Sequence, residues 1–515
     1  MSESRLFDEK LVLIISIFIA GLCSIIYELL ISTTSSYFLG DSVRHFSITI
    51  GVYMASMGLG SFLSRLIQGQ LLLKFIAVEI VLGLVGGACI PLLYWFYAET
   101  DYWGFWTLMI LLITVIGTLT GLEIPLLARI LKTHYPLKIN LSNVLSLDYF
   151  GALLATLLFP FLLLPLIGTF KTSLIFGLIN IGIGFLNLWF FAPILPLRKR
   201  RVFNLAALTV SVFFGVMLFF SQGLLKYWNE SLYRDPIIYQ KQSPYQQLIL
   251  TKSGPDIRLY LNKVIQWSSV DEYRYHESLV HLPMMQARHR KNVLVLGGGE
   301  GLAVREILKY PEVEQVIIVD LDQAVFDLAK DNHFLQEINA RSLYSEKVIP
   351  ITEDAYQFLQ QTQQLFDLII IDLPDPSNES LARLYSREFY KLATKRLAAQ
   401  GIMVTQATSP FFSKRSFWCI AASMEAGGMI NVYPYHTYVP SFGDWGFVMG
   451  ARFPMDSMQW KLEVPTQYLE DAHIQERFYF AKDFQVQDTV INTLDHPTLL
   501  NLYLDDTRRW NRIGI

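Results

Sequence analysis

Acidic residues follow predicted buried strands at several places in the second half of the chain. The apolar run 316–319 ends in Asp320, and the run 366–371 ends in Asp372. In a doubly wound parallel sheet the carboxyl ends of the strands meet at one edge, which is where ligands bind. The acids expected at this edge are Glu300, Asp320, Asp354, Asp372 and Asp375. Because like charges repel each other, the arrangement predicts an acidic pocket whose ligand is a cation.

A glycine-rich loop lies at the centre of this group. The apolar run 293–296 is followed by Gly-Gly-Gly-Glu-Gly at 297–301, and then by a helical pattern and the second strand. Gly297 and Gly299 leave no Cβ in the way of a ligand that approaches the backbone. Asp320 stands about twenty residues further on, where a carboxylate can bind ribose hydroxyls. The pattern predicts a nucleoside site in the first half of a doubly wound sheet.

Glu300 lies inside this loop, at the N-terminus of the predicted helix. A helix N-terminus normally favours a bound anion, but a carboxylate there repels a pyrophosphate. Glu300 therefore argues against a dinucleotide and favours a nucleoside with a cationic tail, such as a sulfonium or an amine. The alternative is that Glu300 only caps the helix through the helix dipole.

Two unlike halves make up the 515 residues of the chain. The composition is 52% hydrophobic and 17% charged, which is more apolar than soluble proteins usually are. Residues 1–224 are mostly apolar runs, and they predict a transmembrane domain of about seven helices. The net charge of −3 gives no reason to expect nucleic acid. Cys23, Cys89 and Cys419 are scattered and indicate neither a disulfide framework nor a zinc site.

The predicted spans begin near Leu11, Phe46, Leu71, Gly104, Val144, Ser173 and Phe203. The span at 144–167 contains two prolines, and a re-entrant segment is the alternative there. Basic residues gather in the loops on the side of the N-terminus, and the positive-inside rule places that side in the cytoplasm. Seven spans then put the second half outside, whereas a domain that uses a cytosolic nucleoside lies inside. We expect a multi-pass protein of the cell membrane with a cytoplasmic second half, against the loop charges.

Four acids interrupt the apolar runs: Glu28, Glu79, Glu123 and Asp148. Charged groups at membrane depth are costly and usually face the interior of a bundle. One interpretation places these acids near helix ends or in pairs with arginines. The other makes them a path or a docking site for a cationic metabolite.

The second half is predicted to be an α/β fold in two parts. Alternating residues and a turn at 253–256 predict a small antiparallel β domain, followed by a helix, within 225–280. Residues 281–515 are predicted to form a Rossmann-like, doubly wound domain with a C-terminal tail that shows helical patches and no motif. The segment 431–450 is predicted to be a loop between the last strands. Its aromatic residues wall the pocket or, in the alternative for Tyr438 and Trp445, belong to the core.

This half resembles the polyamine aminopropyltransferases, the family of the spermidine and spermine synthases, over residues 236–480. The matching motifs, in chain order, are Tyr245-Gln246, Leu259-Tyr-Leu-Asn-Lys-Val-Ile-Gln, Asp271-Glu-x-x-Tyr-His-Glu, the Gly-Gly-Gly-Glu-Gly loop, Asp320-x-Asp322, Glu353-Asp354-Ala355, Asp372-x-x-Asp375-Pro376 and Thr437-Tyr438. The apolar first half is similar to that of the membrane-anchored members of the family.

The resemblance implies a reaction and a role for each site residue. The donor would be decarboxylated S-adenosylmethionine, which is a co-substrate and not a cofactor, and the by-product would be methylthioadenosine. The nucleoside contacts would be Gln246, Gly297, Gly299, Asp320, Asp354 and Ala355. The residues on the amine side would be His276, Glu300, Asp372 and Tyr438, together with the catalytic residues Asp375, as the base, and Tyr275.

Four features depart from the usual family pattern, and one of them is that Ser377-Asn378-Glu379 follows Pro376 where Gly-Pro is usual. Glu300 stands where the loop usually carries Asp, Asp320 where the second strand usually ends in Glu, and Lys263 where a turn glycine is usual. The loop with Glu300 is more similar to the thermospermine synthase branch. The resemblance implies transfer to putrescine, giving spermidine, with spermidine itself as the alternative acceptor.

The expected chemistry follows from the residue types. An amine with a pKa of about 10.4 is mostly protonated at neutral pH, so it must lose a proton before it attacks the carbon beside the sulfonium. Asp375 can accept that proton, and no metal is required. The competing interpretations are a methyltransferase that uses S-adenosylmethionine and a transporter with a polyamine-sensing domain. The expected partners are polyamine and nucleoside substrates and a lipid bilayer; a homodimer is compatible with the sequence, and nucleic acid is not expected.

Overall fold

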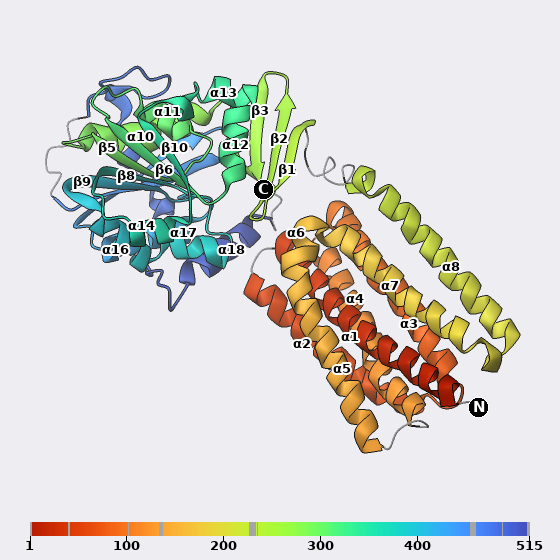
Figure 1. Ribbon diagram of the computed structural model, residues 1–515. Helices are drawn as coiled ribbons and strands as arrows, with labels where there is room; N and C mark the ends of the chain where they lie inside the picture. Colours follow the sequence, from red (N-terminus) through yellow and green to blue (C-terminus); the bar gives the residue numbers. More distant parts are fainter. Residues whose placement is uncertain are drawn as a thin grey trace. The chain divides into compact units, whose positions relative to one another are not determined.

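The computed structural model describes residues 3–39, 42–100, 102–132, 137–225, 233, 235–453, 460–486 and 488–511. The chain forms two compact units, Met1–Arg234 and Asp235–Ile515 (Figure 1). In its described residues the first unit is helical, whereas the second contains two β-sheets.

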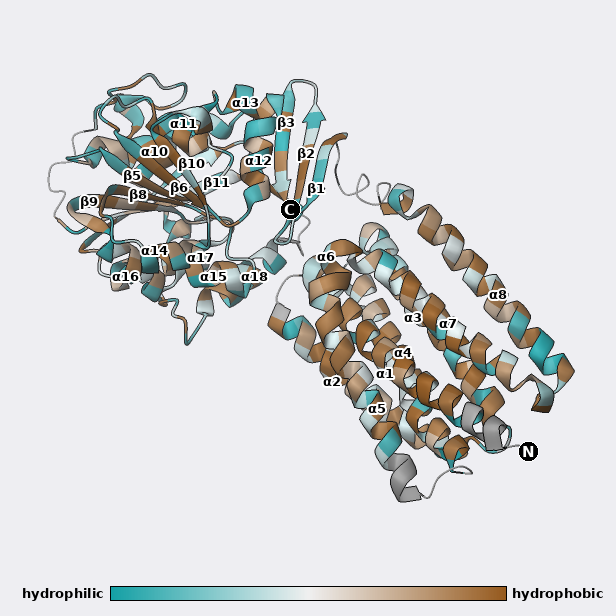
Figure 2. Ribbon diagram, viewed as in Figure 1, coloured by the Kyte–Doolittle hydropathy of each residue, from teal (hydrophilic) through white to brown (hydrophobic). Residues whose placement is uncertain are grey.

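The first unit is a bundle of long helices built mainly from apolar residues (Figure 2). Within the described residues, seven helices are long and apolar enough to cross a membrane. They are α1 (Glu3–Leu39), α2 (Ser42–Leu63), α3 (Leu71–Glu99), α4 (Tyr102–Leu131), α5 (Leu137–Leu158), α7 (Gly168–Phe190) and α8 (Leu197–Phe219). The predicted set of seven apolar helices is confirmed.

The segment that contains two prolines stays helical. Helix α5 continues through a π-helical turn, Phe159–Leu163, into the short helix α6 (Leu164–Leu166). A proline removes one backbone donor and clashes with the preceding turn, and a π-helical turn changes the local hydrogen-bond spacing. Residues 142–166 therefore form one continuous helical run, and the break that suggested a re-entrant segment does not occur.

Glycines allow α2 and α4 to pack through their backbones. A Cβ atom on Gly60 would lie 2.1 Å from the carbonyl oxygen of Thr118, and a Cβ atom on Gly121 would lie 2.1 Å from that of Met57. Small residues at such contacts are typical of helices that associate inside a membrane. Gly60 of α2 is thus a packing residue, whereas Gly51 and Gly58 of the same helix face open space.

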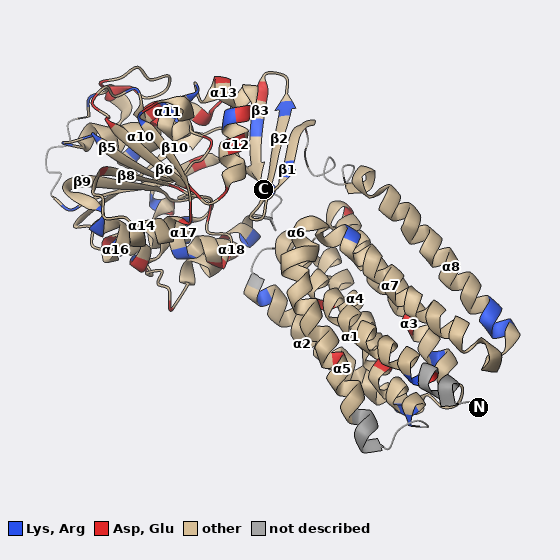
Figure 3. Ribbon diagram, in the orientation of Figure 1, with Lys and Arg blue, Asp and Glu red and all other residues tan. Residues whose placement is uncertain are grey.

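Most basic residues of the first unit lie toward one end of the bundle (Figure 3). Successive spans alternate in direction, so the connections before α3, α5 and α8 belong to the side of the N-terminus. These connections and their flanking turns carry Arg65, Lys74, Arg129, Lys132 and Arg198 to Arg201. The positive-inside rule still assigns this side to the cytoplasm, so the conflict over the orientation persists with seven helices.

A four-stranded antiparallel sheet opens the second unit, as predicted. Its strands are β1 (Ile237–Gln242), β2 (Gln247–Ser253), β3 (Asp256–Leu261) and β4 (Val264–Ser268), in that order. The β3–β4 turn places Asn262 and Lys263 at φ values of +48° and +72°, a region that favours glycine. Helix α10 (Glu272–Gln286) follows, with Asp271 at its N-cap position.

A seven-stranded sheet forms the centre of this unit, in the order β10-β11-β9-β8-β5-β6-β7. Its parallel strands are β5 (Asn292–Gly297), β6 (Gln315–Asp320), β7 (Val348–Thr352), β8 (Phe366–Asp372) and β9 (Leu397–Gln406). The strand order reverses between β5 and β8, where Gly297 pairs with Asp372. Doubly wound sheets bind their ligands at such a switch point.

Alternate side chains of the parallel strands enter two cores. In β5, Val293 and Val295 belong to one core, and Leu294 and Leu296 belong to the other. The first core also receives α10, α11 (Leu302–Ile307), α12 (Gln323–Asp331) and α13 (His333–Ile338); the second receives α14 (Ala355–Gln361), α16 (Arg387–Lys395) and α17 (Lys414–Ala426). Strands that are covered on both faces consist of continuous apolar runs, and such runs can be recognised in the sequence. The predicted Rossmann-like fold is confirmed.

The prediction of a loop at 431–450 is wrong. Strands β10 (Asn431–Val439) and β11 (Gly443–Ala451) form an antiparallel hairpin, and β11 also pairs with β9. Pro434 lies in β10, which is the edge strand of the sheet, and a proline is tolerated there because no neighbouring strand needs its missing donor. Many aromatic and glycine residues interrupt the alternation by which a half-buried strand is normally recognised.

Candidate active site

The glycine loop after β5 makes room for carboxylates of two neighbouring strands. Gly297 and Gly298 have φ values of +85° and +64°, which glycine adopts without steric cost. A Cβ atom on Gly298 would lie 2.9 Å from Oδ2 of Asp372, and one on Gly299 would lie 2.7 Å from Oδ2 of Asp320. The loop therefore needs glycine both for its backbone conformation and for the close approach of these two acids.

Two of the five predicted acids, Glu300 and Asp372, lie beside the imidazole of His276, and a third, Asp320, is close enough to Glu300 to act on it electrostatically. Nε2 of His276 lies 3.8 Å from Oε1 of Glu300, and ligand-type atoms of His276, Glu300 and Asp372 all lie within 4.8 Å of one another. Burial raises the pKa of Asp320 to about 6, and the nearby Glu300 charge adds to this rise. Burial and the Glu300 charge also raise the pKa of Asp372. The cluster is thus a buried group of like charges.

His276 is a cation at the centre of this cluster. Nδ1 of His276 lies 2.7 Å from Oε2 of Glu272, and the Arg305 guanidinium donates to both oxygens of Glu272 at 2.8 and 3.0 Å. Burial alone would lower the pKa of His276, but hydrogen bonds with Glu272 and Glu300 raise this pKa to about 10. A protonated imidazole donates hydrogen bonds from both nitrogens and offers no lone pair to a metal. In this state the imidazole faces Glu300 as a hydrogen-bond donor, and the carboxylates of Glu300 and Asp372 are the acceptors of the cluster.

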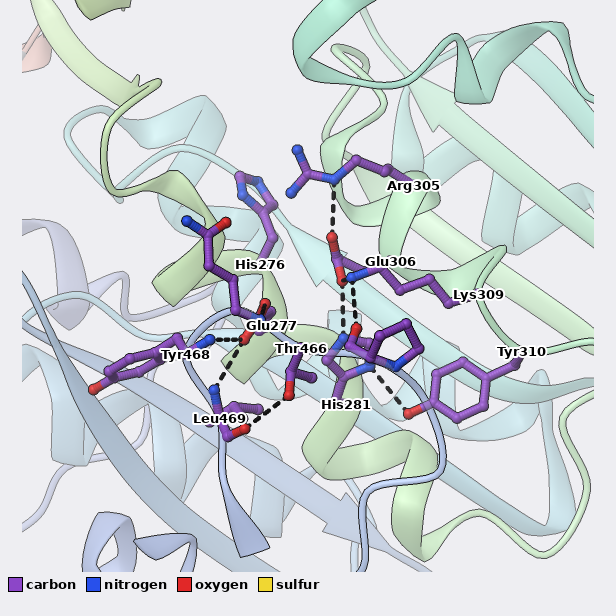
Figure 4. A network of polar contacts seen from close by, with 12 residues as sticks. His276, Glu277, His281, Arg305, Glu306, Lys309, Tyr310, Thr466, Tyr468 and Leu469 are labelled. Atoms are coloured by element: carbon purple, nitrogen blue, oxygen red, sulfur yellow. Dashed lines mark hydrogen bonds and ion pairs between the residues drawn. The ribbon is translucent and has the colours of Figure 1, made fainter.

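A second buried network holds α10 against α11 behind His276 (Figure 4). Nε2 of His281 lies 2.9 Å from Oε2 of Glu306, and its Nδ1 lies 3.0 Å from the Tyr310 hydroxyl. Oε1 of Glu306 accepts a hydrogen bond from Nε of Arg305 at 2.8 Å, and Lys309 Nζ lies 2.6 Å from Oε2. Arg305 thus bridges this network and Glu272, so that the position of His276 depends on both helices.

The hydroxyl of Tyr275 donates a hydrogen bond to Oδ1 of Asp372 at 2.6 Å. The structure therefore pairs Tyr275 with Asp372, whereas Asp375, the other predicted catalytic residue, has different partners. Rings from the β10–β11 hairpin surround Tyr275 with centroids 5.2 to 6.4 Å away: Phe442, Trp445 and Phe447. Burial raises the pKa of Tyr275 well above its ordinary value, so this hydroxyl remains a donor near neutral pH.

Asp375 follows the end of β8, and its partners come from elements to which the sequence analysis assigned no role. The Tyr503 hydroxyl on α18 (Thr498–Asn511) donates to Oδ2 of Asp375 at 2.9 Å, and Nε2 of Gln406 donates to Oδ1 at 3.5 Å. Burial raises the pKa of Asp375 to about 6, and these two hydrogen bonds oppose the rise. The helical pattern of the tail was visible in the sequence, but no spacing linked Tyr503 to a residue 128 positions earlier.

The expected ribose acid, Asp320, is held by backbone donors. Its carboxylate accepts hydrogen bonds from the N–H groups of Asp322 at 2.9 Å and Gly299 at 3.1 Å. Gln246 is connected to Asp320 through Asp322, because Nε2 of Gln246 donates a hydrogen bond to Oδ2 of Asp322 at 3.1 Å. This chain of contacts joins the start of β2 to the end of β6, where the resemblance places the nucleoside.

Asp354 and Tyr438 lie apart from the acid cluster. The Asp354 carboxylate caps α14 by accepting the N–H groups of Tyr356 at 3.0 Å and Gln357 at 3.2 Å, and it forms an ion pair with Arg383. Ala355 is buried at the start of α14. Tyr438 is 56% exposed on β10. Thus Glu300, Asp320 and Asp372 form one cluster, whereas Asp354 and Asp375 have partners of their own.

A doubly wound sheet with a glycine loop and an acidic switch point defines a Rossmann-like domain suited to a cationic nucleoside. The family model of the spermine/spermidine synthase domain matches residues 272–459. The chain is also similar to the spermidine synthase from Thermotoga maritima, for which a crystal structure exists. That comparison has a TM-score of 0.44 and 23% identity, and covers 48% of this chain and 84% of that chain.

Polyamine aminopropyltransferases are similar to this chain along almost its whole length. The relative from Leptospira interrogans is 43% identical over 97% of this chain and 99% of its own. Polyamine aminopropyltransferase 2 from Ralstonia nicotianae is 40% identical over 96% and 98%, and the relative from Oceanobacillus iheyensis is 39% identical over 94% and 95%. The chain belongs to the polyamine aminopropyltransferase family. It is therefore an aminopropyltransferase, and the methyltransferase interpretation is set aside.

Replacing Glu272 by Gln should destabilise the second unit. Removing one partner of a buried ion pair costs about 3 to 5 kcal/mol, because the remaining charge stays buried. The raised pKa of His276 also contributes stability that is fully present below pH 6.5 and is lost as the pH rises through about 10. Thermal unfolding between these pH values should show a lower melting temperature for Glu272→Gln and a weaker decline with pH.

The matched control is Glu314→Gln, which breaks an exposed pair with Lys291. Exposed pairs contribute roughly 0 to 1 kcal/mol, so this variant should unfold like the unmodified protein. Equal melting temperatures for the two variants would contradict the role assigned to Glu272.

Proposed function

We propose that the chain transfers an aminopropyl group from decarboxylated S-adenosylmethionine to putrescine, giving spermidine and methylthioadenosine. The observation that carries the proposal is the convergence of Glu300, Asp320 and Asp372 at the switch point of the sheet. The donor has a sulfonium and an ammonium group but no carboxylate, so a buried acidic cluster attracts it. The names of the relatives and of the matching domain support the same chemistry.

The residues divide between the two substrates. Asp320 accepts two backbone N–H groups, which favours its ionised form and presents an acceptor for ribose hydroxyls. The loop that contains Gly297 and Gly299 admits the nucleoside close to the backbone, and Gln246 approaches it through Asp322. Glu300 and Asp372 hold ammonium groups of the donor tail and of the diamine.

The transfer is a displacement at carbon. The amine nitrogen attacks the carbon beside the sulfonium and forms a C–N bond, while the C–S bond breaks and its electron pair stays on sulfur as a neutral thioether. The amine gives up one proton, and Asp375, with a pKa of about 6, accepts it as a general base. Because both reactants are held by charge, positioning supplies most of the acceleration. No step requires a metal or a cofactor.

The reaction and its acceptor can be tested in one assay. Full-length protein in detergent is given decarboxylated S-adenosylmethionine with putrescine, cadaverine and spermidine together, and the products are identified by mass. We expect methylthioadenosine and mainly spermidine. Asp375→Asn should lower kcat by about 10²- to 10⁴-fold without preventing donor binding, whereas Asp331→Asn, at an exposed position of α12, should not change kcat.

Full activity in Asp375→Asn would contradict the assignment of the base. A product formed mainly from spermidine would establish the alternative acceptor. Binding of both substrates without any methylthioadenosine would favour a polyamine sensor.

Tyr503→Phe should shift the pH dependence of turnover. The Tyr503 hydrogen bond lowers the pKa of Asp375 from the value that burial alone would produce, so its loss raises this pKa. Since the base acts in its deprotonated form, activity at pH 6 should fall more than activity at pH 8, and the acidic limb of the kcat profile should move to higher pH. Tyr479→Phe, at a site that is 75% exposed, is the control, and identical profiles for the two variants would contradict the contact.

We propose that the chain is a multi-pass protein of the cell membrane whose second unit faces the cytoplasm. The seven apolar helices support the membrane location, and the use of a cytosolic nucleoside supports this orientation against the loop charges. A protease-sensitive tag placed after Ile515 should resist protease in intact spheroplasts and be cleaved after lysis. Cleavage in intact spheroplasts would show that the loop charges predict the orientation correctly.

A further inference from the structure

Two glutamates of different helices meet in the interior of the first unit. Glu79 on α3 and Glu123 on α4 are 0% and 2% exposed, and their carboxyl groups are close enough to act on each other electrostatically. Each residue is eight positions from the nearest end of its helix, which is about two turns. The interpretation that these acids lie at helix ends does not apply to them.

The polar groups around Glu79 and Glu123 donate hydrogen bonds to only some of the carboxyl oxygens of the pair. Nδ2 of Asn180 on α7 donates to Oε2 of Glu79 at 2.8 Å, and the Tyr27 hydroxyl on α1 donates to Oδ1 of Asn180 at 3.3 Å. Among the described residues, Oε1 of Glu79 and Oε1 of Glu123 have no donor. Two fully buried acceptor atoms at the same place are therefore left for a ligand that donates hydrogen bonds.

The described side chains around the pair provide no compensating charge. The titratable groups that act on it electrostatically come from α1, α2 and α5: Cys23, Tyr27, Tyr53 and Asp148. Helix α7 contributes the neutral Asn180. None of these groups is a cation at neutral pH, so an ionised pair would leave two negative charges buried in an apolar bundle, which is costly.

The closeness of the two carboxyl groups favours one positive charge between them. Two buried carboxylates that act on each other repel, and a proton on one of them removes this repulsion. Neighbouring buried carboxyl groups do not both ionise readily, and they share a proton instead. An ammonium group offers the same single charge and three donors, enough for the acceptor atoms of both glutamates.

We propose that Glu79 and Glu123 form a monovalent-cation site that holds a shared proton and exchanges it for the ammonium group of an amine. The amine enters as a monocation, with any second amino group neutral, so one positive charge enters as the proton leaves and the total charge at the pair does not change. The choice of a diamine as the ligand rests on the proposed function, whereas the shared proton does not. Because both carboxyl groups are closed off from solvent, exchange requires a movement of the surrounding helices.

Infrared difference spectroscopy of the full-length protein in lipid tests the site. Spectra are recorded at pH 8, where the carboxyls of Asp320 and Asp375, with pKa values of about 6, are ionised. The unmodified protein should show the carbonyl band of a protonated carboxyl group, and saturating putrescine should remove this band. In Glu79→Gln and in Glu123→Gln the putrescine-induced change should fall at least tenfold.

The control is Glu28→Gln, which changes an acid of α1 and should keep the putrescine-induced change. Aminopropyl transfer is measured on every preparation, and unchanged activity shows that the variants fold. Absence of the band in the unmodified protein, a band that putrescine does not affect, or a full response in either glutamine variant would overturn the proposal. A normal band response without aminopropyl transfer would overturn the proposed function and leave this site in place.

Discussion

Repulsion among buried carboxylates is the constraint on which the catalytic unit depends. Glu300 and Asp372 face each other across the switch point of the sheet, and both lie close to His276. Glu272, which binds the other nitrogen of the imidazole, raises the pKa of His276 together with Glu300 and Asp372. Arg305 in turn binds Glu272 through two contacts. Acids and cations therefore alternate from the pocket into the core, and each charge is stabilised by the next.

Several of the residues that fix this arrangement of charges belong to one short segment at the start of helix α10. Asp271 accepts hydrogen bonds from Ser441 in the β10–β11 turn at 2.6 and 2.9 Å, Glu272 binds the cations, and Tyr275 binds Asp372. Glu277 accepts three backbone N–H groups of residues 467–469 at 2.6 to 3.0 Å (Figure 4). Buried polar residues are costly unless they are satisfied, and here each one attaches the helix to a different segment. The polarity of this buried helix is thus explained by its contacts.

The sequence was informative where local chemistry decides the structure, and it failed where tertiary pairing does. Parallel strands buried on both faces read as apolar runs, so their ends, and with them Asp320 and Asp372, could be placed. The hairpin that contains Pro434 could not, because its strands depend on pairing with β9. The same holds for Tyr503, whose role exists only because α18 lies beside the end of β8. Asp354 also serves as a helix cap, a role that its position at a strand end did not reveal, and its predicted contact with the nucleoside stays a prediction.

The two units compensate buried acids in different ways. In the catalytic unit the chain provides the positive charge itself, through His276 and Arg305. In the helical unit the titratable neighbours described around Glu79 and Glu123 are acids, phenols and a thiol. Burying an unpaired charge is costly, and the described residues supply no cation at this pair. A proton and an ammonium group are the two carriers that we propose for it, and the proposed ligands of the acidic pocket are amines as well.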